Sequence, residues 1–378
     1  MNNITNIDKY KVFLIFMLIT SSLRFTSVGL ATLIPALGSF TIFLFSFRRS
    51  IKINVIFIFF TFLALLHAFN NQETIKGVFK VSACAAAYLG CFYFSRVYSE
   101  LIKSYLNKFF FIFFIFLSLE TICRIFFGDY FRVTSFNYYF TTVDDLIISG
   151  GFYAYKTGSP FFLDSNFTGL FILPFLYLYS VAKAKKIPNF RGRLILFAFT
   201  LVVLLTFSRT LWLILVIYFL FFIFYRHITV LKLAVAAPVL LFISLIFIEV
   251  LYVFISNDGS FGTKLGIWAS LIEKSESQSL SRLLFGYGFD TGKFIYSFKE
   301  GVTAHALYPQ LVGEVGLLGA LLYSLVLVSI LSRGKEGVLF FISIMLVGFS
   351  LFDPWDPVTF SLIALTNGAL LVGSSSKS

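Results

Sequence analysis

Long apolar runs recur along almost the whole chain, and they restrict its fold more than any other feature. About twelve of them approach the roughly 20 residues that an α-helix needs to cross the hydrocarbon core of a bilayer. Hydrophobic residues make up 58% of the 378 residues and charged residues only 13%, so a single water-surrounded core cannot bury the apolar surface. The sequence therefore predicts an all-α polytopic membrane protein, with residues 1–378 forming one integral membrane domain. The expected runs are 10–28, 29–47, 52–69, 75–95, 106–127, 160–181, 193–208, 210–225, 230–255, 306–331, 336–352 and 357–373.

Basic residues follow every second run. Arg48 comes after the second run, Lys186 after the sixth and Arg333 after the tenth, whereas most acidic residues lie in the other connections. Because short cytoplasmic loops of membrane proteins are rich in lysine and arginine, both termini are expected in the cytoplasm. The net charge of +12 then reflects topology, and no nucleic-acid partner is expected.

Two connections on the outward side are too long to serve only as links between spans. They cover residues 128–159 and 256–305, and loops of such length are commonly functional. Within the second loop, the spacing of residues 262–286 predicts an amphipathic helix that lies at the outer interface of the membrane. Any chemistry of this protein is therefore expected on the outward face.

Two arginines are candidates for binding an anion at this face. Arg209 lies where two apolar runs meet, and a guanidinium so close to hydrocarbon is costly unless it finds an anion or water. Arg282 lies in the large loop beside Gly286 and Gly288, where backbone without side chains approaches a ligand closely. Snorkelling or contact with lipid phosphate are the alternative interpretations. Together the two arginines suit bidentate binding of a pyrophosphate.

His305 is predicted at the outer face, just before the run 306–331. An imidazole there suits removal of a proton from a hydroxyl nucleophile near neutral pH, although a histidine that caps the following helix is the alternative. Glu314 lies nine residues later in apolar sequence, and a carboxylate inside a span is a functional candidate, for substrate contact or for pairing with an arginine. Tyr287 and Lys264 are further candidate substrate-binding residues in the large loop.

Other polar residues have stronger structural interpretations. Asp164 and Asn166 lie at the start of the sixth run, where such side chains commonly cap helices. Glu120 and Arg124 are four residues apart and suit an internal ion pair. Trp355, in the outward turn DPWDP, is expected to act as an interfacial anchor. No nucleotide-binding or metal-binding motif occurs, so no cofactor and no metal are expected.

The stretch His305-Ala306, a nine-residue spacer and Gly316-Leu317-Leu318-Gly319 resembles the signature of the O-antigen ligase and O-antigen polymerase superfamily. Three further elements in the same order are similar to motifs of that family. They are LDSNFTG at 163–169, Ser208-Arg209-Thr210, and Arg282 with LLFGYGFD. Ala306 departs from the ligase pattern, which has a small polar residue there, so the resemblance is nearer to the polymerase branch.

The resemblance implies a metal-independent glycosyltransferase of GT-C type in the inner membrane of a Gram-negative bacterium, with its active site facing the periplasm. The donor would be a glycan on undecaprenyl pyrophosphate, and the acceptor the terminal sugar of a new lipid-linked repeat unit. Membrane lipid and a chain-length regulator protein are the other implied partners. In this hypothesis Arg209 and Arg282 hold the pyrophosphate and His305 is the base. Asp164, Asn166 and Glu314 orient sugars or arginines.

Two alternative functions remain open at this point. A ligase that transfers the finished glycan to the lipid A core would use the same donor and much of the same site. A flippase for lipid-linked oligosaccharides would also be a basic protein with many spans. A flippase is expected to have charges throughout a central cavity, whereas the charges here gather at the outer ends of the runs.

Overall fold

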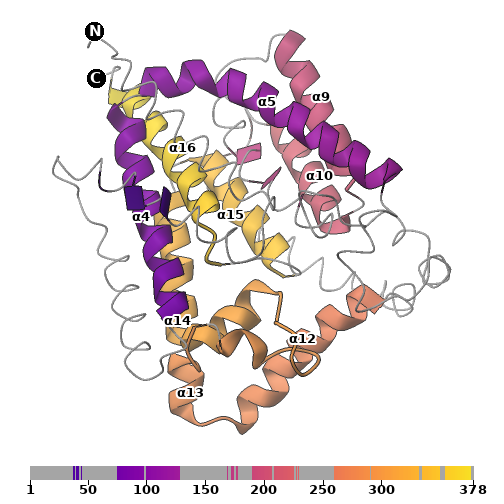
Figure 1. The fold of residues 1–378 in the computed structure, drawn as a ribbon, viewed down its shortest axis with the longest axis vertical. Helices are drawn as coiled ribbons and strands as arrows, with labels where there is room; N and C mark the ends of the chain where they lie inside the picture. Colours follow the sequence, from indigo (N-terminus) through magenta and orange to yellow (C-terminus); the bar gives the residue numbers. More distant parts are fainter. Residues whose placement is uncertain are drawn as a thin grey trace. The chain divides into compact units, whose positions relative to one another are not determined.

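The part of the chain that the structure describes consists mainly of helices. The computed structural model describes residues 75–97, 99–127, 190–206, 208–224, 259–289, 291–331, 334–349 and 354–375, with isolated positions between 37 and 44, between 168 and 177, and at 227 and 229. No strand occurs in these ranges (Figure 1). The predicted all-α class is therefore confirmed for them. The runs 10–28, 52–69 and 230–255 and the loop 128–159 lie outside the described residues.

Each predicted run that falls within the described ranges coincides with a helix, because a helix satisfies its own backbone in apolar surroundings. The helices are α4 (Ile75–Val97), α5 (Ser99–Phe126), α9 (Phe190–Leu204), α10 (Arg209–Ile223), α12 (Gly259–Ser277), α13 (Leu280–Phe285), the 3-10 helix η3 (Gly292–Phe294), α14 (Leu307–Leu331), α15 (Lys335–Gly348) and α16 (Pro357–Ser375).

Two helices in the described ranges are long and apolar enough to cross a membrane, over Gly77–Arg96 in α4 and Leu307–Val328 in α14. The helix segment Thr210–Ile223 is also apolar but shorter. At a rise of about 1.5 Å per residue, a helix of 15 residues such as α10 covers about 22 Å, less than the roughly 30 Å of a hydrocarbon core. The total of about twelve spans therefore stays a prediction.

The chain divides into two compact units. Unit 1 comprises residues 1–53, 82–215 and 356–378, and unit 2 comprises residues 54–81 and 216–355. Most of α4, all of α5 and α9, and α16 belong to unit 1, whereas α12 to α15 belong to unit 2. The prediction of a single membrane domain stays a prediction.

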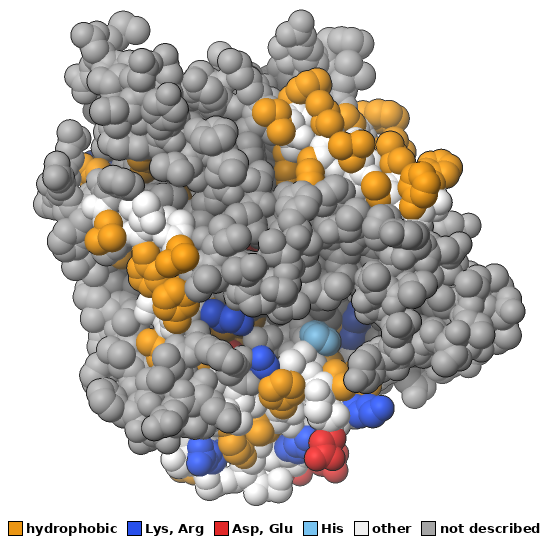
Figure 2. Space-filling model, in the orientation of Figure 1, with side chains coloured by type: hydrophobic (Ala, Val, Ile, Leu, Met, Phe, Trp, Pro, Cys, Tyr) orange, Lys and Arg blue, Asp and Glu red, His pale blue; other side chains and the backbone are white. Residues whose placement is uncertain are grey.

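In unit 1 the helix α5 packs against both α9 and α16. Phe113 of α5 stacks on Phe199 of α9, with ring centroids 6.0 Å apart. The opposite face of α5 exposes large apolar side chains at helical spacing, among them Ile115, Leu119 and Ile122. Figure 2 shows hydrophobic side chains gathered on the surface over α5 and α9. Such a face suits contact with lipid.

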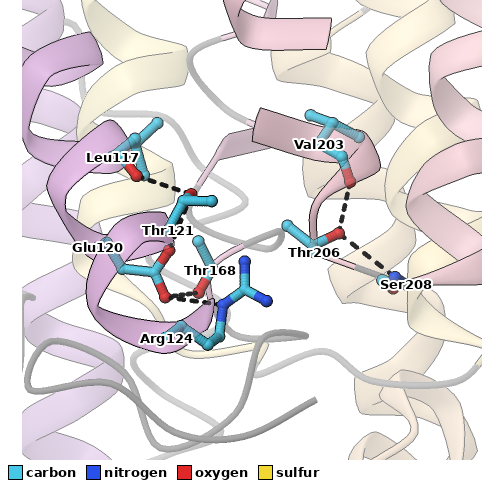
Figure 3. Close-up of polar contacts among 8 residues, drawn as sticks. All are labelled: Leu117, Glu120, Thr121, Arg124, Thr168, Val203, Thr206 and Ser208. Carbon is cyan, nitrogen blue, oxygen red and sulfur yellow. Dashed lines mark hydrogen bonds and ion pairs between the residues drawn. The ribbon is translucent and has the colours of Figure 1, made fainter. Parts of the chain in front are cut away.

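The predicted ion pair between Glu120 and Arg124 is confirmed. Arg124 Nε lies 3.2 Å from Glu120 Oε1, and both side chains are fully buried in unit 1 (Figure 3). The hydroxyl of Thr168 donates to Glu120 Oε1 at 3.2 Å, and that of Thr121 donates to Glu120 Oε2 at 3.4 Å. The two opposite charges thus lie in contact inside unit 1, and two hydroxyls add hydrogen bonds to the carboxylate, which lowers the cost of burying the pair.

Replacing Arg124 by alanine is expected to destabilise the protein by about 3–5 kcal/mol, because the Glu120 carboxylate stays buried without its counter-charge. The double variant Glu120→Gln/Arg124→Leu is expected to regain most of this stability, since it removes both charges. Apparent melting temperatures in detergent provide the measurement. Equal losses for the single and the double variant would contradict a structural ion pair.

The predicted amphipathic helix at 262–286 consists of two helices rather than one. α12 ends at Ser277, and α13 begins at Leu280 after Ser279. Ser279 has extended backbone, with φ −65° and ψ 144°, and its Oγ accepts from the N–H of Arg282 at 3.4 Å. A serine in this conformation satisfies a free N–H at the start of the next helix, which explains why the helix restarts there.

Candidate functional site

The helix α14 is broken inside its apolar stretch. Gly316 has φ 69° and ψ −177°, so the helical backbone stops there and resumes beyond it. A break leaves the carbonyl groups of the preceding turn without their usual partners four residues on, and apolar surroundings make such groups costly. Other donors must therefore reach the carbonyls of Gly313 and Glu314.

The loop after α13 supplies these donors. The N–H of Tyr287 donates to the Gly313 carbonyl at 2.8 Å, and that of Gly288 donates to the Glu314 carbonyl at 3.0 Å. The sequence FGYG therefore acts as a backbone clamp on the broken helix. We expected the bare backbone at Gly286 and Gly288 to approach a ligand, whereas in this structure it approaches α14.

Two glycines with positive φ make this close contact possible. Gly286 has φ 79°, and a Cβ added to it would lie 2.6 Å from the Gly316 nitrogen. A Cβ on Gly316, in turn, would overlap the Leu284 carbonyl and the Phe285 nitrogen. Only glycine combines this conformation with this proximity. The FGYG element and Gly316, the first glycine of the GLLG motif, therefore form one structural unit.

Arg282 extends from the short helix α13 at the clamp, and its side chain is exposed. Its guanidinium carbon lies 5.1 Å from the centroid of the Tyr287 ring, an attractive arrangement for a cation over an aromatic face. Tyr287, predicted to bind substrate, thus contacts the arginine itself. The structure brings Arg282 and Tyr287 to the segment that holds Glu314.

Glu314 is buried, with 3% of its surface exposed, on the turn that precedes the break. The indole Nε1 of Trp355 donates to its Oε2 at 2.7 Å. Trp355 is itself 5% exposed and packs edge to face against Phe289 and Tyr323. The expectation that Trp355 is an interfacial anchor is wrong, because the indole lies inside unit 2, where it donates to a carboxylate.

His305 lies two residues before the first residue of α14, and its side chain is exposed. The Thr303 hydroxyl lies 3.1 Å from its Nδ1 and 3.3 Å from its Nε2. Both flanking residues, Ala304 and Ala306, are fully buried and form a cluster with Ile267 of α12. The backbone around His305 is thus fixed while the imidazole reaches the surface.

The helix α12 is held against the rest of unit 2 at Trp268. The Trp268 Nε1 donates to the Phe349 carbonyl at 3.1 Å, and the two aromatic rings stack with centroids 4.8 Å apart. Lys264 lies one turn before this anchor on the same helix, with a half-buried side chain. Lys264, which we predicted to bind substrate, therefore belongs to the helix that packs beside His305.

Replacing Trp355 by phenylalanine is expected to destabilise unit 2 by about 1.5–3 kcal/mol, because the buried Glu314 carboxylate loses a hydrogen bond. Trp268→Phe is the matched control, since it also removes one indole N–H but affects a neutral carbonyl, for a loss of about 1 kcal/mol. Apparent melting temperatures of both variants give the comparison. An equal loss would show that Glu314 does not depend on Trp355.

Tyr296 forms a further contact between the loop and α12. Its hydroxyl donates to Gln278 Oε1 at 2.8 Å, which ties the segment after η3 to the end of α12. Burial is the main reason why the pKa of Tyr296 lies above its usual value. The phenol therefore remains protonated, and a donor, at neutral pH.

The remaining predicted site residues belong to unit 1 or lie outside the described residues. Arg209 is the first residue of α10 and belongs to unit 1, after the turn in which Thr206 Oγ1 accepts from the N–H of Ser208 at 3.3 Å (Figure 3). Asp164 and Asn166 lie outside the described residues. Within the described ranges, no three His, Cys, Asp or Glu side chains gather as metal ligands.

Unit 2 thus presents an exposed guanidinium on α13 and an exposed imidazole just before α14, and the Glu314 carboxylate is buried within α14. A guanidinium suits a phosphate group, and an imidazole accepts a proton near neutral pH.

No family model matches this chain, and neither a curated protein nor a solved structure shows significant similarity to it.

Sequence reasoning missed the pairing of Trp355 with Glu314 and the break at Gly316. A signal for the break was present in the sequence. The glycines at 286, 288, 313 and 316 form two closely spaced pairs, as expected where two backbones meet.

Proposed function

We propose that this chain polymerises O-antigen or a related surface polysaccharide. It transfers the growing glycan from undecaprenyl pyrophosphate to the terminal sugar of a new lipid-linked repeat unit, at the periplasmic face of a Gram-negative inner membrane. The observation that carries the proposal is the clamp between α13 and the broken α14. It joins Arg282 to the helix that begins just after His305 and contains the buried Glu314.

The chemistry needs one base and stabilisation of one leaving group. His305 removes the proton of the acceptor hydroxyl, whose oxygen forms a bond to the anomeric carbon of the donor. The bond from this carbon to the pyrophosphate oxygen breaks, and undecaprenyl pyrophosphate leaves with the electron pair. Arg282 neutralises the charge that develops on this leaving group, and Arg209 has the same role in the full proposal. Asp164, Asn166 and Glu314 orient the sugars or the arginines.

The proposal includes a GT-C-type architecture with about twelve spans, both termini in the cytoplasm and no metal requirement. The apolar helices α4 and α14 and the exposed apolar faces of the described helices support a membrane location. A chain-length regulator is a further proposed partner.

Arg282→Ala is expected to lower polymer formation by roughly 10²-fold, because the leaving-group charge loses its counter-charge. Arg282→Lys keeps the charge but cannot form the bidentate hydrogen bonds of a guanidinium, so a loss of about 10-fold is expected. Arg96→Ala removes an exposed arginine from the predicted cytoplasmic end of α4 and is the matched control. The rate of glycan elongation at equal protein amount is the measurement. Equal rates for the Arg282 and Arg96 variants would contradict the assignment.

Loss of the gene distinguishes the polymerase from the ligase. A strain without a polymerase is expected to carry lipopolysaccharide capped with single repeat units, and the complete gene is expected to restore long chains. Lipopolysaccharide without any cap would indicate a ligase. Unchanged long chains in the deletion strain would contradict both activities.

A further inference from the structure

A cavity of about 630 Å³ lies in unit 2 between α12 and the segment 294–301. Its volume is within the ~300–1,000 Å³ that is common for small-molecule sites. Arg282, His305 and Glu314 do not line it. It is therefore a second feature beside the proposed reaction site. Figure 2 shows basic, acidic and hydrophobic side chains interspersed on the surface over α12 and α13.

A buried hydroxyl in the cavity wall has no hydrogen-bond partner among the described residues. Ser270 is 8% exposed, and its Oγ makes no hydrogen bond to any residue that the structure describes. Buried polar groups in native proteins almost always have a partner, so an unsatisfied one in a cavity wall suggests an absent ligand or solvent. The Oγ itself has almost no accessible surface, so a ligand hydroxyl would reach it after rotation of the short serine side chain and would then act as donor or acceptor.

The other walls combine aromatic rings with balanced charges. Phe294 and Phe298 line the cavity and are 41% and 38% exposed, so apolar ring surface remains open to a ligand. Four charged residues also line it, and they are two of each sign: Glu273, Lys274, Lys299 and Glu300. The two carboxylates disfavour an anionic ligand, and the two ammonium groups disfavour a cation. A neutral ligand that has hydroxyl groups and one apolar face fits best, and sugar rings have this character.

The cavity and the residues that flank His305 contact the same turn of α12. Gly266 lines the cavity, and the next residue, Ile267, packs against Ala304 and Ala306 on either side of His305. The segment 294–301, which forms the wall opposite α12, is also linked to the residues beside His305, because the Ala304 N–H donates to the Lys293 carbonyl at 2.7 Å. Lys274 Nζ donates to the Ile295 carbonyl at 2.7 Å and holds that wall to α12.

We propose that this cavity binds neutral sugar residues of an oligosaccharide. That the oligosaccharide is part of a lipid-linked substrate, with the cavity holding sugars other than the reacting one, rests on the proposed function. Binding of a free oligosaccharide does not depend on it.

The probe for the test is the repeat-unit oligosaccharide released from its lipid pyrophosphate by mild acid. Saturable binding to the purified full-length protein in detergent is expected by saturation-transfer NMR. Phe294→Ala is expected to weaken it by roughly 10-fold, and Ser270→Ala by about 3- to 10-fold because one hydrogen bond to the ligand is lost. Phe285→Ala, which removes an exposed ring from α13 outside the cavity, is the matched control. It is expected to bind as the wild type does.

Ser270→Ala also separates binding from folding. It removes a buried hydroxyl that has no partner, so its apparent melting temperature is expected to be unchanged or higher while sugar binding falls. Absence of saturable binding by a wild type that elongates lipid-linked glycan would overturn the cavity proposal and leave the proposed function intact. Equal affinity of all variants would overturn it as well. Binding with this variant pattern by a protein that makes no polymer would support the cavity and count against the polymerase.

Discussion

His305→Ala is expected to reduce polymer formation by about 10²–10⁴-fold, the usual contribution of a positioned general base. The protein is expected to accumulate and fold normally, because the His305 side chain is exposed while the packing at this place comes from Ala304 and Ala306. The measurement is elongation of lipid-linked glycan in membranes that contain equal amounts of each variant.

His227→Ala is the matched control for this prediction. His227 is also exposed, but it follows α10 on the side that we predict to be cytoplasmic. It is expected to support a normal rate. Normal polymer from His305→Ala at normal expression would remove the imidazole from the reaction. A similar loss in both variants would point to an effect on folding instead of catalysis.

Gly316→Ala is expected to prevent correct docking of α13 on α14, with a loss of more than about 4 kcal/mol. A side chain at this residue would adopt an unfavourable positive φ and would also overlap the backbone of Leu284 and Phe285. Thermal stability in detergent, followed by size-exclusion chromatography, is the measurement. The variant is expected to elute as aggregated or partly unfolded protein.

Gly301→Ala separates the two contributions to this loss. Gly301 has φ 74°, close to that of Gly316, but nothing lies within 4 Å of an added Cβ. Only the backbone strain of about 1–2 kcal/mol is therefore expected for it. If the two variants were equally stable, the contact between α13 and α14 would not depend on the glycine at 316.

The sequence predicted the helices of the described ranges because apolar composition and length suffice to define a helix in lipid. It did not predict the break in α14. Glycine is common in membrane spans, so Gly316 within the apolar run 306–331 does not by itself indicate a break. The conformation at this residue depends on the loop after α13, which satisfies the carbonyls that the break releases.

The candidate site was predictable only in its residue types. Arg282 and His305 stood out because charged and titratable groups are rare in this chain and both lie in a loop that is predicted to face outward. The hydrogen-bond partner of Glu314 could not be predicted, because Trp355 is 41 residues away in the sequence and no local pattern links the two. The cavity beside α12 was equally hidden, since its walls come from two segments whose approach depends on the contact between Lys274 and Ile295.

Reconstitution of the purified chain tests the central claim most directly. The protein would be placed in liposomes with a radiolabelled lipid-linked repeat unit and no other protein, and product length would be read on a gel. The account predicts a ladder of glycans from the wild type that collapses to the single repeat unit in His305→Ala. Product that forms only after addition of a lipid A core acceptor, or no product under either condition, would contradict it.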